Sequence, residues 1–127
     1  MKSRKGWIRV GSKEYYVKSS WEANMALYYQ LLKKNGDICD WEYEPDTFWF
    51  ERIRRGVRSY TPDFKIWISE EDFYYVEVKG YMDSKSKTKI KRMKKYFPQV
   101  ELRVITKKEY NTISKVKRVI PEWDRLV

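Results

Sequence analysis

Residues 60–80 read YTPDFKIWISEEDFYYVEVKG, and this stretch decides the fold of the chain. Residues 64–68 and 73–79 alternate in polarity and are rich in β-branched and aromatic side chains, a pattern typical of β-strands. The polar residues 69–72 between them are typical of a turn. We therefore predict two adjacent antiparallel strands that form a hairpin.

The pairing register of this hairpin decides whether two carboxylates meet. If Asp63 lies opposite Glu77, their Cα atoms are about 4.5–5.5 Å apart and both side chains share one face. Lys79 shares that face because strand side chains repeat every second residue. A slip of one residue would separate the carboxylates, so this register is a hypothesis that the chemistry favours.

Two carboxylates held together at neutral pH repel each other unless a cation or a shared proton intervenes. Oxygen ligands of this kind suit Mg²⁺ or Mn²⁺, which take one or two carboxylates and complete their coordination with water and phosphate. A lysine beside such a site, here Lys79, can hold the attacking water or stabilise charge on the phosphate. Taken singly, each of these residues is ordinary for a solvated strand face, but their spacing in a strongly basic chain favours a metal site.

The same residues resemble a known family signature. Pro62-Asp63 followed by Glu77-Val78-Lys79 resembles the bipartite motif of the PD-(D/E)XK nuclease superfamily, and Gly80 matches a common extension of it. Three further segments support the resemblance, namely residues 19–22 (SSWE), 43–45 (YEP) and 60–61 (YT). Over residues 14–106 the chain is similar to small phage and transposon-end nucleases and to Holliday junction resolvases of archaeal and phage types.

The resemblance implies a restriction-endonuclease-like core with a metal-dependent catalytic site. It assigns metal binding to Asp63, Glu77 and the backbone carbonyl of Val78, and the positioning of the attacking water to Lys79. It also implies that Glu22 is a third carboxylate, which completes this site or adds a second one. Hydrolysis by such a site leaves a 5′-phosphate and a 3′-hydroxyl.

Glu22 also has a structural interpretation. Ser19 or Ser20 is expected to cap a helix that runs to about Lys34 and ends at Asn35-Gly36. Glu22 lies three residues after Ser19, which is the partner position of a capping box. The structural and catalytic roles are compatible if Ser20 is the cap.

The remaining pattern predicts an α/β fold in one domain, residues 1–127, with a central mixed β-sheet flanked by helices. Within it, residues 1–18 form a basic N-terminus and small hairpin, and residues 107–127 form a C-terminal helix and tail. The further elements expected are strands at 7–10, 14–18, 38–43, 47–53 and 100–105, and helices at 85–96 and after Thr106.

Two smaller expectations concern the acidic site and the core around it. Trp21, Met25, Tyr28 and Leu32 share one face of the first helix, which we expect to be buried. Glu44 could extend the acidic cluster, although a residue before proline at a strand end is more often structural.

Composition narrows the class of protein. The formal net charge is +10, and the chain has one cysteine and no histidine, which excludes His-based nucleases, Cys/His zinc modules and Ser-His or Cys-His hydrolases. One cysteine cannot form an internal disulfide, and no apolar run could span a membrane. We therefore expect an intracellular, cytoplasmic protein. A phage origin is suggested only by the family likeness. The charge indicates an anionic polymer as partner, most simply DNA. An anionic membrane is less favoured, because the charge is not confined to one amphipathic segment.

Two segments concentrate the positive charge. One is the loop around Gly56, and the other is the helix expected at residues 85–96. A helix this basic repels itself, which is easier to explain if DNA phosphates lie against it. The loop is equally well explained as a solvated, mobile segment. The candidate DNA-binding residues are Arg54, Arg55, Arg58, Lys85, Lys87, Lys89 and Lys91.

These features together predict a Mg²⁺-dependent endodeoxyribonuclease, with Mn²⁺ as a substitute and no nucleotide cofactor. The small size and lack of a sequence-reading domain favour structure-specific cleavage of branched DNA, as by a Holliday junction resolvase. Such an enzyme is expected to be a homodimer, since two strands of a symmetric substrate are cut. The alternatives are a sequence-specific or nicking endonuclease of phage, restriction or transposon type, acting on duplex DNA, and a non-catalytic DNA-binding module.

Overall fold

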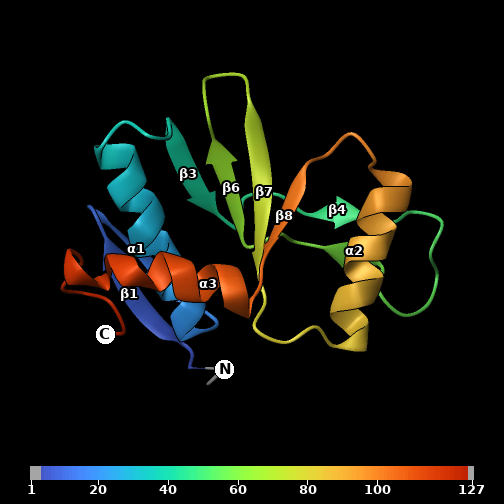
Figure 1. Ribbon diagram of the computed structural model, residues 1–127. Coiled ribbons are helices and arrows are strands. Elements are labelled where there is room, and N and C mark those ends of the chain that lie inside the picture. The colour runs from blue at the N-terminus through green and yellow to red at the C-terminus, as the bar shows by residue number, and fades with distance from the viewer. Residues whose placement is uncertain (1–3, 126–127) are drawn as a thin grey trace.

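A four-stranded mixed sheet forms the centre of the molecule. The computed structural model describes residues 4–125, so the first three and last two residues of the predicted N-terminus and tail lie outside it. The strands, in their order across the sheet, are β3 (Asp40–Tyr43), β6 (Phe64–Trp67), β7 (Phe73–Val78) and β8 (Leu102–Ile105). The first three are antiparallel neighbours, and β8 runs parallel to β7. Helices lie on both sides of this sheet (Figure 1), which confirms the predicted fold class.

The β6–β7 hairpin has the register on which the predicted site depends. Phe64 is paired with Val76 at the end of the ladder. One step further along the same register, Asp63 lies opposite Glu77. Val76 and Val78 point to the other face, where they are 1% and 4% exposed.

One face of the sheet packs against most of the remaining chain (Figure 1). The elements involved are β1 (Gly6–Val10), β2 (Lys13–Val17), α1 (Ser20–Lys34), α3 (Lys107–Ile113) and the 3-10 helix η1 (Ser114–Arg118). Together with the sheet they form the larger hydrophobic cluster, which includes Val17, Met25, Phe64 and Trp123. Trp123 thus holds the C-terminal segment against the core.

The opposite face carries a smaller hydrophobic cluster, centred on Phe50, Tyr60 and Met93. Its elements are α2 (Ser84–Tyr96) and the short ribbon formed by β4 (Phe48–Trp49) and β5 (Ser59–Tyr60). Phe48 connects this cluster to the sheet, because its ring lies 5.2 Å from that of Tyr75 on β7. The site described below lies between the two clusters.

Polar side chains cap the starts of the helices. Ser19, one of the two predicted caps, caps α1 by accepting a hydrogen bond from the Glu22 N–H, and Asp83 caps α2 through the Ser86 N–H. Thr106 and Glu109 form a capping box at the start of α3. None of the helices within residues 4–125 is long and apolar enough to cross a membrane.

Two expectations are corrected by the structure. The strand expected at residues 47–53 ends at Trp49, because the chain turns there and the Ile53 N–H bonds the Phe50 carbonyl. This turn brings Phe50 and Ile53 into the smaller cluster.

The second correction concerns α1, where Met25 is buried as expected but Trp21, Tyr28 and Leu32 are only half-buried. Because both the β1–β2 hairpin and the sheet cover α1, its buried surface is wider than one stripe.

Asn24 ties α1 to the C-terminal segment. Its side chain is 1% exposed and donates to the Tyr110 hydroxyl at 2.8 Å and to the Asp124 carboxylate at 2.7 Å. Its carbonyl oxygen accepts the Asp124 N–H at 2.8 Å. These bonds satisfy a buried amide and fix the path of the chain after η1.

We predict that Asn24→Ala lowers the free energy of unfolding by about 2–3 kcal/mol, because the buried partners lose their hydrogen bonds. Urea unfolding followed by circular dichroism measures the change. Asn111→Ala, at an exposed position on α3, serves as the control and should stay within about 0.5 kcal/mol of wild type. Equal losses of unfolding free energy in the two variants would show that the buried hydrogen bonds of Asn24 do not stabilise the fold.

Candidate active site

Four residues with carboxylate side chains converge at one end of the central strands. Glu44 follows β3, Asp63 precedes β6, and Glu77 is the penultimate residue of β7. These positions meet because β6 runs antiparallel to both neighbours, so its start lies beside their ends. Glu22 reaches the same place from the first turn of α1.

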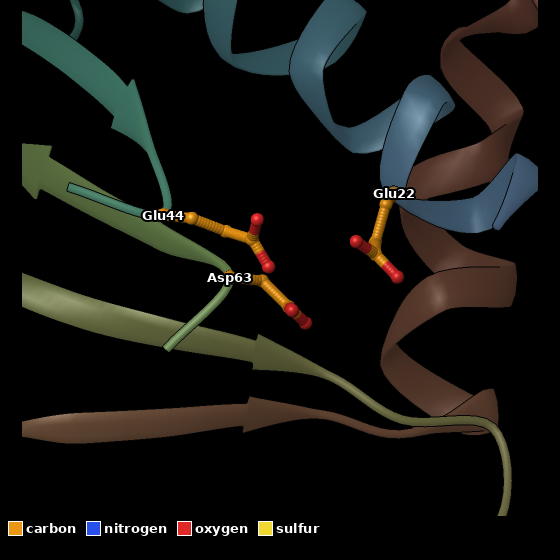
Figure 2. A group of neighbouring side chains, drawn as sticks. All are labelled: Glu22, Glu44 and Asp63. Atoms are coloured by element: carbon orange, nitrogen blue, oxygen red, sulfur yellow. The ribbon is translucent and has the colours of Figure 1, made fainter. Parts of the chain in front are cut away.

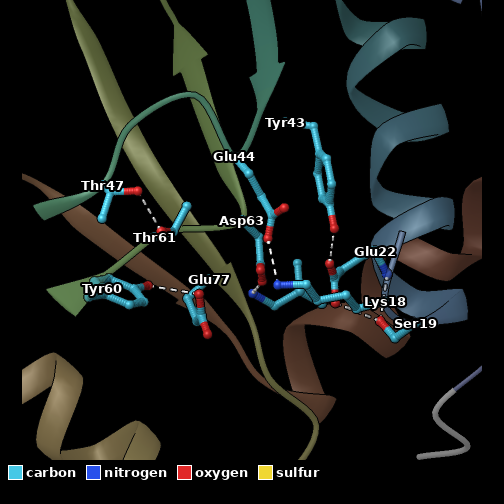
Figure 3. A network of polar contacts seen from close by, with 11 residues as sticks. Lys18, Ser19, Glu22, Tyr43, Glu44, Thr47, Tyr60, Thr61, Asp63 and Glu77 are labelled. Carbon is cyan, nitrogen blue, oxygen red and sulfur yellow. Dashed lines mark hydrogen bonds and ion pairs between the residues drawn. The ribbon is translucent and has the colours of Figure 1, made fainter. Parts of the chain in front are cut away.

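Three of these carboxylates form a compact group. Glu22, Glu44 and Asp63 each offer one carboxylate oxygen, and the three atoms lie within 4.8 Å of one another (Figure 2). We call these three residues the acidic group. Glu22 and Asp63 are each 8% exposed, so this negative charge is largely withdrawn from water. Glu77, 9% exposed, lies outside the acidic group, on the other side of Asp63 from Glu22 (Figure 3).

The backbone of Glu44 is unusual. Its φ of 48° is in the left-handed region, which non-glycine residues rarely adopt. Its N–H donates to the Asp63 carbonyl at 2.8 Å, one step beyond the β3–β6 ladder. This turn directs the Glu44 carboxylate toward Asp63 (Figure 2). The structure therefore places Glu44 in the acidic cluster, the less favoured of its two sequence interpretations.

Glu22 lies at the predicted position after the helix cap and also in the acidic group, with Ser19 and not Ser20 as the cap. Its role as a metal ligand stays a prediction. Its N–H donates to the Ser19 hydroxyl oxygen, which caps the helix, and the Ser19 hydroxyl in turn donates to Glu22 Oε2, both at 3.1 Å. Its other oxygen, Oε1, accepts a hydrogen bond from the Tyr43 hydroxyl at 2.6 Å (Figure 3). Burial raises the pKa of the Glu22 carboxyl, against the lowering effect of these two hydrogen bonds. Helix capping by Ser19 and a place in the acidic group are thus compatible.

Asp63 and Glu77 are held by different donors. Asp63 Oδ2 accepts the Val78 N–H at 2.7 Å, and Glu77 Oε1 accepts the Tyr60 hydroxyl at 2.7 Å (Figure 3). Burial raises the pKa of Asp63 well above its ordinary value, and the charges of Glu77 and Glu22 raise it further. Burial also raises the pKa of Glu77. In both residues, burial disfavours the charged form of the carboxyl.

Three lysines surround the carboxylates. Lys79 is half-buried just beyond β7, and its charge acts with that of Lys89 to lower the pKa of Glu77 against the larger effect of burial. Lys89, on α2, also lies 5.9 Å from the centre of the Tyr60 ring. Lys18, which follows β2, pairs with Glu44 Oε2 at 3.2 Å (Figure 3). Positive charge therefore approaches the site from three separate elements.

The elements that carry the predicted DNA-binding residues lie next to each other. The loop between β4 and β5 lies beside α2 (Figure 1), and the two are joined by a hydrogen bond from the Arg92 guanidinium to the Val57 carbonyl. The structure thus brings together two basic segments that are distant in sequence. Lys89 is half-buried, and the exposed members are Arg54, Arg55, Arg58, Lys85, Lys87 and Lys91.

Sequence reasoning missed the contribution of Lys18 and the hydrogen bonds of Tyr43 and Tyr60. The only available signal for the tyrosines was their position next to the motif segments. Nothing in the spacing of Lys18 indicated its contact with Glu44, because that contact depends on how the hairpin docks. The Val78 carbonyl, expected as a ligand, stays a prediction, whereas the N–H of Val78 is the group that contacts Asp63.

Comparison with known proteins adds no relative: no family model, no curated protein and no solved structure matches this chain. The family resemblance therefore depends on the motif residues, and the site must be judged by its own geometry.

The raised pKa of Asp63 predicts how the metal-free protein responds to pH. Asp63 keeps its proton in the folded state at a pH where the unfolded chain, with a pKa of 3.8, has released it. Its contribution to stability is therefore present below about pH 4 and is lost as the pH rises through the folded-state pKa. Asn carries no charge at any of these pH values.

We expect Asp63→Asn in EDTA to be more stable than wild type at pH 7 by about 1–2 kcal/mol, or several degrees in Tm, and to show little gain at pH 4. Thermal unfolding at both pH values measures the difference. Asp37→Asn, at an exposed position, is the matched control. If Asp63→Asn gains the same stability at pH 4 and at pH 7, the raised pKa of Asp63 is contradicted.

Proposed function

We propose that the protein is a metal-dependent endodeoxyribonuclease that hydrolyses phosphodiester bonds, with Mg²⁺ as cofactor and Mn²⁺ as substitute. The observation that carries this proposal is the convergence of the buried carboxylates Glu22, Asp63 and Glu77, beside Lys79, in a chain of net charge +10. Buried like charges are costly unless a cation compensates them. The general basic character of the chain indicates that the substrate is a polyanion.

The residues present fit a hard divalent cation. All the side-chain donors are carboxylate oxygens, and the site contains no histidine or thiol ligand that would favour a softer metal. Asp63, Glu77 and the Val78 carbonyl would hold the ion. Glu22 and Glu44, whose oxygens lie within 4.8 Å of that of Asp63, would be further ligands. When bound, Mg²⁺ supplies Lewis-acid stabilisation of charge on the phosphoryl oxygens.

The chain itself supplies orientation. The Val78 N–H fixes Asp63, and the hydroxyls of Tyr43 and Tyr60 fix Glu22 and Glu77. Such hydrogen bonds hold the carboxylates in place before substrate arrives, which reduces the reorganisation needed during reaction. Lys79 would orient the attacking water and offset charge that develops on the phosphate.

Branched DNA is the proposed substrate class. The exposed basic residues lie on α2 and on the adjacent β4–β5 loop, and Lys89 of α2 approaches the site at Tyr60. This arrangement supports contacts with the phosphate backbone, which position DNA without reading its sequence. A four-way junction is symmetric and has two strands to cut, so a homodimer is proposed as the active species.

A cleavage assay tests the function. With Mg²⁺, wild type should cut a labelled four-way junction symmetrically and leave linear duplex intact, and EDTA should abolish cutting. Asp63→Asn, Glu77→Gln and Lys79→Ala should each lower the cleavage rate by about 10²–10³-fold while DNA binding is retained. The first two variants weaken a metal ligand, and the third removes a positive charge beside the reacting phosphate. Glu70→Gln, in the exposed β6–β7 turn, is the control and should cut like wild type.

The other outcomes separate the alternatives. Cutting of both substrates would keep the nuclease but identify a sequence-specific or nicking endonuclease. Tight DNA binding with no cutting in any divalent metal would identify a non-catalytic DNA-binding module.

The salt dependence of DNA binding tests the basic surface. Changing Lys85, Lys87 and Lys91 together to Gln should reduce the slope of log K against log salt by up to about 2–3, since each phosphate contact contributes about 0.9. Changing Lys107, Lys108 and Lys115 to Gln removes the same charge from exposed positions on α3 and η1, across the sheet from α2. Equal effects of the two triple variants would show that only net charge matters.

A further inference from the structure

Lys18 lies at the junction between the β1–β2 hairpin and the acidic group. It is the first residue after β2, and its side chain extends toward the carboxylates (Figure 3). Its Nζ is 3.2 Å from Glu44 Oε2, although the side chain remains 64% exposed. The stem of Lys18 therefore runs through solvent, and its charged end contacts the acidic group.

The ammonium of Lys18 interacts with all three members of the acidic group. Its pKa is raised by the hydrogen bond to Glu44 and by the charges of Glu44, Glu22 and Asp63. Among the ion pairs formed within residues 4–125, the Lys18–Glu44 pair is the one that reaches this group. Lys79 and Lys89 act instead on Glu77, at the other side of Asp63.

We propose that Lys18 is a built-in counter-ion of the acidic group, which competes with a divalent cation for Glu44 and lowers the affinity of the site for that cation. The inference rests on the proposed metal site. A carboxylate oxygen that is paired with an ammonium must give up that pair before it can serve as a ligand. In addition, one positive charge a few ångströms away makes the group less attractive to a second cation.

The position of Lys18 makes this competition reversible. An ion pair whose lysine is largely exposed contributes little to stability, so a divalent cation can displace the ammonium at modest cost. The flexible, solvated stem allows Lys18 to leave without movement of β2. Lys18 is thus a positioning residue, whose effect on the reaction passes through Glu44.

Metal binding without DNA tests the proposal. Isothermal titration with Mn²⁺ should give an affinity about 3–10-fold tighter for Lys18→Met than for wild type. Lys18→Arg keeps the charge and should bind Mn²⁺ about as wild type does. Lys13→Met, which changes an exposed lysine of β2, should alter the affinity by less than about 2-fold.

Thermal unfolding gives a second measurement that needs no catalysis. In EDTA, Lys18→Met should melt below wild type at pH 7, because the acidic group has lost its counter-ion. Saturating Mn²⁺ should then raise the Tm of Lys18→Met by more than it raises that of wild type.

The possible failures are distinguishable. If Lys18→Met binds Mn²⁺ no tighter than wild type while Asp63→Asn binds it much more weakly, the metal site stands and the role of Lys18 is overturned. If Asp63→Asn and wild type bind Mn²⁺ equally, or neither binds it, the metal site itself is overturned, and the proposed function falls with it.

Discussion

The hydrogen bonds that Tyr43 and Tyr60 donate to Glu22 and Glu77 hold two buried carboxylates where little water reaches them. Without such donors, the carboxylates would lose the hydrogen bonds that water provides to the unfolded chain. The donors offset part of the cost of burial, but burial remains the larger effect, which is why the pKa values of both carboxyls remain raised. The fold thus gathers carboxyl groups at one end of the central strands, in a chain of net charge +10.

The sequence was sufficient to predict the features that depend on local periodicity. The β6 and β7 strands follow from their alternation and from the short polar turn between them. Their register was a hypothesis that the chemistry of Asp63 and Glu77 favoured, and the structure confirms it. The start of α1 follows from the pair Ser19-Ser20, although only the structure identifies Ser19 as the cap. These local rules, together with the predicted element order, account for the α/β architecture.

Features that depend on packing between distant segments were beyond sequence reasoning. The contact of Lys18 with Glu44 requires the β1–β2 hairpin to dock beside α1, and no periodicity encodes that docking. The turn after Trp49 also depends on packing between distant segments. The aromatic residues there favour a strand by sequence, but Phe50 and Ile53 pack in the smaller cluster with α2. Glu44 was ambiguous because its role depends on a left-handed backbone, a conformation that its residue type disfavours.

Tyr60 belongs to the smaller hydrophobic cluster through its ring and to the site through its hydroxyl. That cluster buries far fewer side chains than the larger one. Regions with fewer buried contacts open locally at a lower free energy than the whole domain unfolds. Opening of α2 and the β4–β5 ribbon would release Glu77 while the larger cluster stays folded. The stability of the site is therefore set by the local stability of α2 and the β4–β5 ribbon. A global melting curve overstates the stability of the site.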